Sequence, residues 1–147
     1  MKIALGSDHA GFEAKESIER WLIDQGFACF DKGTHDTESC DYPDFAGEVA
    51  RSISIGESEM GILVCGTGIG MSICANKIEK VRAALCHDEH TAQMSREHND
   101  SNVLCLGARL NDQESLLRIV GKWLNTPFGG DRHARRVSKI GDLEQRR

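Results

Sequence analysis

The fold of this chain is indicated most clearly by the stretch Met60-Gly61-Ile62-Leu63-Val64-Cys65-Gly66-Thr67-Gly68-Ile69-Gly70. Its first half is an uninterrupted apolar run, as is typical of a strand buried on both faces of a parallel sheet. Its second half is rich in glycine, and the residues after Gly70 follow a helical pattern. The stretch therefore predicts a strand, a tight turn and a helix, with Cys65 at the carboxyl edge of a sheet.

The expected position of Cys65 suits acid–base chemistry. The N-terminus of a helix offers unpaired N–H groups and a positive dipole end, which bind anions and lower the pKa of a nearby thiol. A thiolate there can remove a proton next to a carbonyl, because donors already point at the oxyanion that forms. The alternative is structural, a tight strand-to-helix turn that carries a buried cysteine. Enzyme is the leading class.

Strand and helix patterns alternate outward from this stretch in both directions. Strands are expected at 2–6, 27–31, 60–65, 81–85 and 103–107, and helices at 11–24, 43–55, 70–78, 90–97, 111–124 and 131–147. Residues 32–41 have no periodicity and are expected to form a loop. Alternating elements of this kind predict an α/β fold, a single three-layer Rossmann-like domain over residues 1–147 with a five-stranded parallel sheet.

Composition excludes several classes of protein. The chain has 147 residues and a formal net charge of −5, which argues against a nucleic-acid binder. No apolar stretch approaches the roughly 18 residues that a membrane helix needs. The six cysteines form no Cys-x-x-Cys pair, and the N-terminus has no signal-peptide pattern. We therefore expect reduced thiols and a cytoplasmic protein.

Polar side chains follow the predicted strands at their carboxyl ends, where ligands bind in open α/β sheets. These residues are Ser7, Asp8, His9, Asp41, Tyr42, Cys65, Thr67, His87 and Arg109. His98, Asn99 and Asp100 instead precede the fifth strand. They would need a loop that folds back to reach the same edge, or they form a helix end and a turn.

Three known glycine-rich or cysteine motifs do not fit the turn after Cys65. A P-loop ends in Lys-Ser or Lys-Thr, whereas Met71-Ser72 follows Gly70 here. A dinucleotide fingerprint has a different glycine spacing and follows the first strand. A cysteine phosphatase loop has an arginine at the position of Met71. His87 and His90 resemble half of a metal site, but no third ligand is suggested nearby, so no metal is expected.

Together, five motifs resemble the type B ribose-5-phosphate isomerase family, a group that includes galactose-6-phosphate and allose-6-phosphate isomerases. The motifs are Gly6–Phe12, Asp41–Pro43, Cys65–Gly70 with Ala75–Lys77, Arg96–Asn102, and Arg132–Val137. The resemblance covers nearly the whole chain. Some members of the family use a glutamate at the position of Met71 as the base. Met71 together with Cys65 is typical of the cysteine branch.

The resemblance implies a metal-independent aldose–ketose isomerase that needs no cofactor and acts through an enediolate. It makes Cys65 the base that moves the proton between C2 and C1, with Thr67 hydrogen-bonding near the reacting oxygens. His98 would open the sugar ring with help from Asp8, because imidazole titrates near neutrality. The substrate implied is ribose 5-phosphate. A six-carbon sugar phosphate and a non-catalytic sugar-phosphate-binding subunit are the alternatives.

The family also implies which residues bind the substrate. These are His9, Arg109, Arg132 and Arg136 for the phosphate, Tyr42 and Asn99 for the sugar, and the backbone of Gly66, Gly68, Ile69 and Gly70 for the enediolate oxygens. The basic segment 131–147 has only a thin apolar stripe, and in the family it reaches a neighbouring subunit. The resemblance therefore implies a homodimer with shared active sites, or a tetramer built from such dimers.

Overall fold

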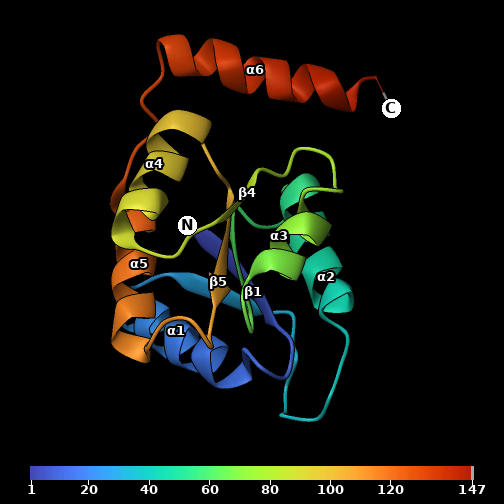
Figure 1. Ribbon diagram of the computed structural model, residues 1–147, viewed down its shortest axis with the longest axis vertical. Coiled ribbons are helices and arrows are strands. Elements are labelled where there is room, and N and C mark those ends of the chain that lie inside the picture. Colours follow the sequence, from blue (N-terminus) through green and yellow to red (C-terminus); the bar gives the residue numbers. More distant parts are fainter. Residues whose placement is uncertain (147) are drawn as a thin grey trace.

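The computed structural model describes residues 1–146 and contains one parallel sheet with strand order β2-β1-β3-β5-β4 (Figure 1). The strands are β1 (Lys2–Ser7), β2 (Ala28–Asp31), β3 (Met60–Cys65), β4 (Ala83–Leu85) and β5 (Val103–Gly107). The helices are α1 (Phe12–Asp24), α2 (Tyr42–Ser54), α3 (Ile69–Ala75), α4 (Glu89–Asn99), α5 (Gln113–Asn125) and α6 (Arg132–Glu144). The predicted three-layer α/β fold is confirmed.

The sheet has a separate apolar core on each face, because successive side chains of a strand point to opposite sides. On one face Leu5 and Ile62 pack with Trp123 of α5, beside α1 and α4. On the other face Leu63 and Cys105 pack under α2 and α3. Every residue of the central strand β3 is buried, as its apolar run predicts.

Two elements are shorter than their patterns predict, and Asn76 explains both. The helix expected at 70–78 ends at Ala75, and the strand expected at 81–85 begins at Ala83. The Asn76 side chain donates to the Ala83 carbonyl oxygen (2.9 Å) and accepts from the Ala83 N–H (2.9 Å). The amide thus pairs with the backbone of β4 at the point where the helix would otherwise continue.

The start of α5 also differs from the prediction. The helix predicted from residue 111 begins at Gln113, and the Asp112 carboxylate caps it by accepting a hydrogen bond from the Ser115 N–H (2.8 Å). That hydrogen bond holds the pKa of Asp112 below its usual range. Across residues 1–146, no helix combines the length and apolar character needed to cross a bilayer.

A buried lysine joins α1 to β2. The Lys15 side chain is fully buried, and its ammonium lies 2.6 Å from Asp31 and 2.8 Å from Glu16. The ammonium also lies 5.4 Å from the centre of the Phe12 ring. A buried cation is stable only when it is paired, so these contacts fix the register of α1 on the sheet.

Replacing Lys15 by methionine is expected to lower the free energy of unfolding by about 2–3 kcal/mol, because two carboxylates lose their buried counter-ion. Chemical denaturation of the variant measures this loss. The matched control is Lys32→Met, which removes the exposed Lys32–Glu57 pair (3.0 Å) and should cost less than about 1 kcal/mol. Equal losses in the two variants would show that burial of Lys15 is unimportant.

Candidate active site

Most of the predicted site residues lie together at the carboxyl edge of β1, β3 and β5. Hydrogen bonds connect the three strand ends, from the Asp8 N–H to the Val64 carbonyl (3.3 Å) and from the Ala108 N–H to the Cys65 carbonyl (2.9 Å). The Arg109 N–H donates to the Gly66 carbonyl (3.0 Å). We call this cluster the carboxyl-edge half-site: Asp8, His9, Tyr42, Cys65, Gly66, Thr67, Gly68, Ile69, Gly70 and Arg109.

The thiol of Cys65 is held against the glycine-rich turn. Its residue is only 5% exposed, and the sulfur accepts a hydrogen bond from the Gly68 N–H (3.1 Å). The next amide, of Ile69, donates to the Thr67 hydroxyl (3.3 Å). The backbone N–H groups at the start of α3 therefore lie next to Cys65 and Thr67, the two side chains of this turn to which the family resemblance gives a catalytic role.

Gly68 is required by both conformation and space. Its φ is +79°, in the left-handed region that favours glycine. A Cβ atom there would lie 2.6 Å from Leu85 Cδ1 and 2.9 Å from the Leu106 carbonyl carbon. The turn can therefore fold back onto β5 and direct its amides at Cys65 only because residue 68 has no side chain.

A Gly68→Ala variant is expected to lose most activity and about 3 kcal/mol or more of stability. The cost of the left-handed backbone conformation and the cost of the steric clash of the new Cβ atom add to each other. Gly130→Ala is the matched control, since Gly130 also has a positive φ (+65°) but nothing lies within 4 Å of its Cβ position. The control should lose only about 1 kcal/mol. Thermal unfolding of both variants measures the difference, and similar losses would contradict the packing argument.

Asp8, His9 and Tyr42 complete this half-site. Asp8 is 7% exposed, and its carboxylate accepts from the Gly11 N–H (3.1 Å). The Cys40 N–H donates to His9 Nδ1 (3.2 Å), so a neutral His9 has its proton on Nε2. The Tyr42 ring packs on Gly70, where a Cβ atom would lie 2.6 Å from it. The guanidinium of Arg109 lies beside Gly66 in the same way.

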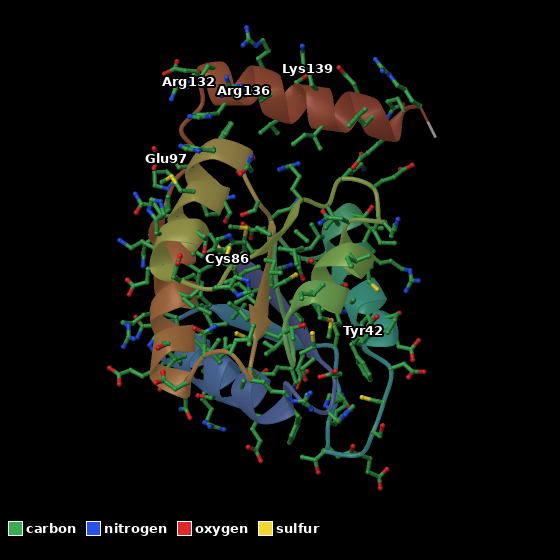
Figure 2. All side chains as sticks on the ribbon, viewed as in Figure 1. Tyr42, Cys86, Glu97, Arg132, Arg136 and Lys139 are labelled. Atoms are coloured by element: carbon green, nitrogen blue, oxygen red, sulfur yellow. The ribbon has the colours of Figure 1, made fainter. Side chains whose placement is uncertain are left out.

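The remaining predicted residues lie at the opposite edge of the sheet. The last turn of α4 carries His98 and Asn99 to the amino end of β5, and the first turns of α6 carry Arg132 and Arg136 to the same end. Figure 2 shows Arg132 and Arg136 on α6 at one end of the molecule and Tyr42 well away from them, at the start of α2. We call His98, Asn99, Arg132 and Arg136 the amino-edge half-site.

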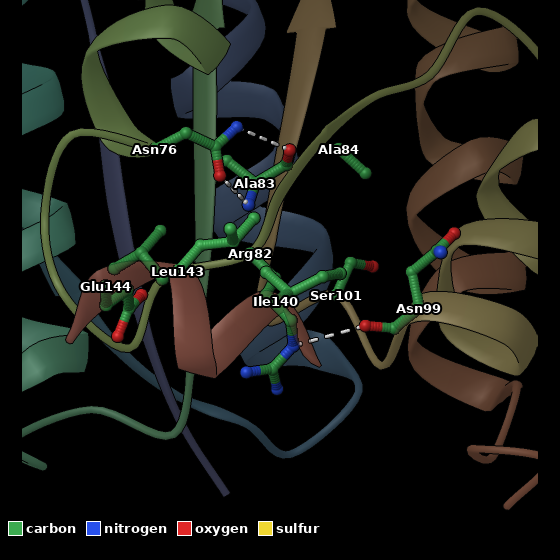
Figure 3. Close-up of a pocket in the computed structure, with 10 residues that line it drawn as sticks. Asn76, Arg82, Ala83, Ala84, Asn99, Ser101, Ile140, Leu143 and Glu144 are labelled. Carbon is green, nitrogen blue, oxygen red and sulfur yellow. Dashed lines mark hydrogen bonds between the residues drawn. The ribbon is translucent and has the colours of Figure 1, made fainter. Parts of the chain in front are cut away.

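Of the two alternatives for residues 98–100, the described chain has the helix end and turn, and it has no loop that returns His98 to the carboxyl edge. Helix α4 runs through Asn99 and ends at Asp100, whose φ is +46°. The Asp100 carboxylate pairs with Arg82 (3.3 Å) and Arg96 (2.8 Å). Arg82 Nε also donates to the Asn99 carbonyl (3.1 Å; Figure 3). These contacts anchor the end of α4 at the amino edge of β4.

A cavity of about 340 Å³ adjoins the amino-edge half-site. Figure 3 shows Ile140 and Leu143 of α6 facing Arg82 and Asn99 across it. None of the residues of α6 is buried, and Leu143 is 61% exposed. The apolar stripe of α6 is therefore only partly covered within one chain.

His133 lies within the Arg132–Val137 motif, but the sequence assigned it no role of its own. Its ring stacks on that of His98, with ring centres 4.3 Å apart and planes at 13°. In the sequence His133 is one more polar residue among arginines. Only the packing of α6 on α4 brings the two rings together.

The unusual segment 87–90 has a structural role in this chain. The Asp88 carboxylate caps α4 by accepting from the Thr91 N–H (2.7 Å) and the Thr91 hydroxyl (2.9 Å). These hydrogen bonds hold the pKa of Asp88 below its usual range. The acidic residue between His87 and His90 is therefore explained by capping.

Comparison with known proteins identifies the family. The family described as Ribose/Galactose Isomerase matches residues 3–140. Ribose-5-phosphate isomerase B of Escherichia coli (strain K12) is 47% identical over 146 residues, which cover 99% of this chain and 98% of that protein. The structure of Clostridium thermocellum ribose-5-phosphate isomerase B has a TM-score of 0.98 at 49% identity and covers 99% of both chains.

A further structure contains a sugar phosphate. Ribose-5-phosphate isomerase B from Mycoplasma genitalium with bound ribulose 5-phosphate has a TM-score of 0.97 at 38% identity, covering 99% of this chain and 97% of that one. The resemblance drawn from the five motifs is thereby confirmed. This chain belongs to the ribose/galactose isomerase family.

Proposed function

We propose that this chain is a ribose-5-phosphate isomerase that interconverts ribose 5-phosphate and ribulose 5-phosphate through an enediolate. The observation that carries the proposal is the 47% identity to the E. coli enzyme over 99% of the chain. The M. genitalium relative with bound ribulose 5-phosphate supports the same choice of substrate, at a TM-score of 0.97. The carboxyl-edge half-site offers the base and the backbone donors that this chemistry needs.

In the proposed mechanism the Cys65 thiolate removes the proton from C2 of the open-chain sugar. The electron pair of that C–H bond forms the C1–C2 double bond, and the C1 carbonyl becomes an enediolate oxygen. The Thr67 hydroxyl and amides of residues 66–70 stabilise this oxygen. Cys65 then returns the proton to C1, and the proton of the C2 hydroxyl is transferred to O1, so C2 becomes the carbonyl and C1 carries the hydroxyl. No net redox partner is needed.

We place the two half-sites together by pairing two copies of the chain. Within one chain they lie at opposite edges of the sheet, so one chain alone cannot bring His98 to Cys65. Helix α3 contacts edge strand β4, and residues of β4 and α6 line the same cavity between the two edges. In the proposed dimer, a twofold rotation about an axis through this side of the molecule would bring each carboxyl-edge half-site to the amino-edge half-site of its partner.

The side chains exposed on this side of the molecule support a subunit contact. Ile69 and Ile73 of α3 are 49% and 57% exposed, and Ile140 and Leu143 of α6 are 40% and 61% exposed. Burying apolar side chains against a second copy gives the stabilisation that the thin stripe of α6 lacks in one chain.

The shared site assigns a role to each remaining residue. The partner's His98 would protonate the ring oxygen, with Asp8 assisting, while the C1 hydroxyl loses its proton and the bond between C1 and the ring oxygen breaks, which opens the furanose. Arg109 and His9 of one subunit would face Arg132 and Arg136 of the other around the phosphate, since arginine binds phosphate bidentately. Tyr42 and Asn99 would contact the sugar hydroxyls from the two sides.

The test of the function is a coupled isomerase assay with added chelator. Ribose 5-phosphate, allose 6-phosphate and galactose 6-phosphate are compared, and light scattering measures the mass of the protein in solution. Chelator-resistant turnover of ribose 5-phosphate by a dimer or tetramer is expected. Preference for a six-carbon substrate would refute the substrate, and full activity of a monomer would refute the shared site.

The cytoplasm is the compartment that suits this protein. All six cysteines are free thiols, and Cys65 must stay reduced to act as a base. Burial raises the pKa of Cys29 to about 11 and that of Cys105 well above its usual value. These two thiols are therefore inert, as expected of small buried hydrophobic side chains.

A further inference from the structure

The stack of His98 on His133 is the feature of the amino-edge half-site that the mechanism has not used. His98 belongs to the last turn of α4 and His133 to the first turn of α6, so the contact joins two helices. The Gly129 N–H donates to the Glu97 carbonyl (2.9 Å), which fixes the connecting segment on α4. A Cβ atom on Gly129 would lie 3.4 Å from His133 Cδ2, so this segment also packs closely on the His133 ring.

The charges around the pair disfavour a proton on His133. Partial burial lowers the pKa of His133, and the positive charges of His98, Arg132 and Arg136 lower it further, while Glu97 acts in the opposite direction. From α4, Glu97 Oε1 lies 4.0 Å from His98 Nε2. Two imidazolium rings stacked at 4.3 Å would repel each other, so the stack favours at most one proton on the pair.

We propose that His133 is a positioning residue for His98: its ring stacks on the His98 imidazole and fixes the plane of that ring, so that His98 is oriented for proton transfer to the sugar. The proposal rests on the proposed function for the identity of the sugar. The stack itself does not depend on that function. A flat ring at residue 133 is sufficient for this role, whereas a small side chain is not.

The test compares His133→Phe, which keeps a flat ring, with His133→Ala, which removes it. His133→Ala is expected to lower kcat for ribose 5-phosphate by about 10- to 100-fold, because His98 loses its fixed orientation. His133→Phe should stay within about threefold of wild type in kcat. Both variants lose the polar atoms of the His133 ring, so KM is expected to rise in both. The difference in kcat between His133→Ala and His133→Phe should remain. His90→Ala, at the opposite end of α4, is the control.

Proton NMR provides a readout that does not depend on activity. The His98 ring protons, assigned by their absence in His98→Gln, should be shifted upfield by the neighbouring ring in wild type and in His133→Phe. The shift should be lost in His133→Ala. Equal kcat losses in the two variants, or unchanged His98 shifts in His133→Ala, would overturn the proposal. If wild type did not turn over ribose 5-phosphate, the proposed function would fail and the NMR shift alone would decide the stack.

Discussion

A Cys65→Ala variant is expected to lose at least about a thousandfold in kcat, because it removes the base that is held against the backbone donors of the glycine-rich turn. The fold should survive. Removing the sulfur leaves the Gly68 N–H without its acceptor and opens a small cavity, which together cost about 1–2 kcal/mol. Steady-state kinetics measure the first effect, and thermal unfolding followed by circular dichroism measures the second.

Cys105→Ala is the matched control for this variant. Cys105 belongs to the same apolar core cluster as Cys65, is fully buried, and has a pKa raised well above its usual value by burial and by neighbouring thiols. Its loss should lower stability by a similar amount and leave kcat near that of wild type. Retention of a tenth of the activity in Cys65→Ala, or an equal kcat loss in Cys105→Ala, would rule out Cys65 as the base.

The fold was predictable from sequence where one pattern dominates an element. The run before Cys65 is apolar at every position, and β3 is buried at every position. The hydrophobic pattern failed to predict the end of an element where a single side chain forms hydrogen bonds with the backbone of a neighbouring strand. The hydrogen bonds of Asn76 to β4 end α3 early, and no periodicity in residues 70–78 signals them.

The candidate site, like the fold, was predictable from the sequence only in part. The carboxyl-edge half-site follows from topology, because the ends of parallel strands meet at one edge. The amino-edge half-site does not, since helix α4 carries His98 away from that edge and only the family resemblance connected it to Cys65. His133 lies in the Arg132–Val137 motif, but its stack on His98 could not be predicted, because that contact depends on how α6 packs on α4.

Mixing two inactive variants is expected to restore activity if the active site is shared. Cys65→Ala lacks the base in both of its sites, and His98→Gln lacks the ring-opening acid in both. When the two chains are co-expressed and pair at random, half of the dimers are mixed. Each mixed dimer has one site with both residues intact and one site with neither, so about a quarter of wild-type activity should return.

A second mixture combines the double variant Cys65→Ala/His98→Gln with wild type in equal amounts. Every site of a mixed dimer then lacks one of the two residues, and only wild-type dimers turn over, which again leaves about a quarter of the activity. If each chain held a complete site, this mixture would retain about half, and the mixture of single variants would recover nothing. The two mixtures therefore separate a shared site from a site within one chain, because only a shared site gives the same value in both.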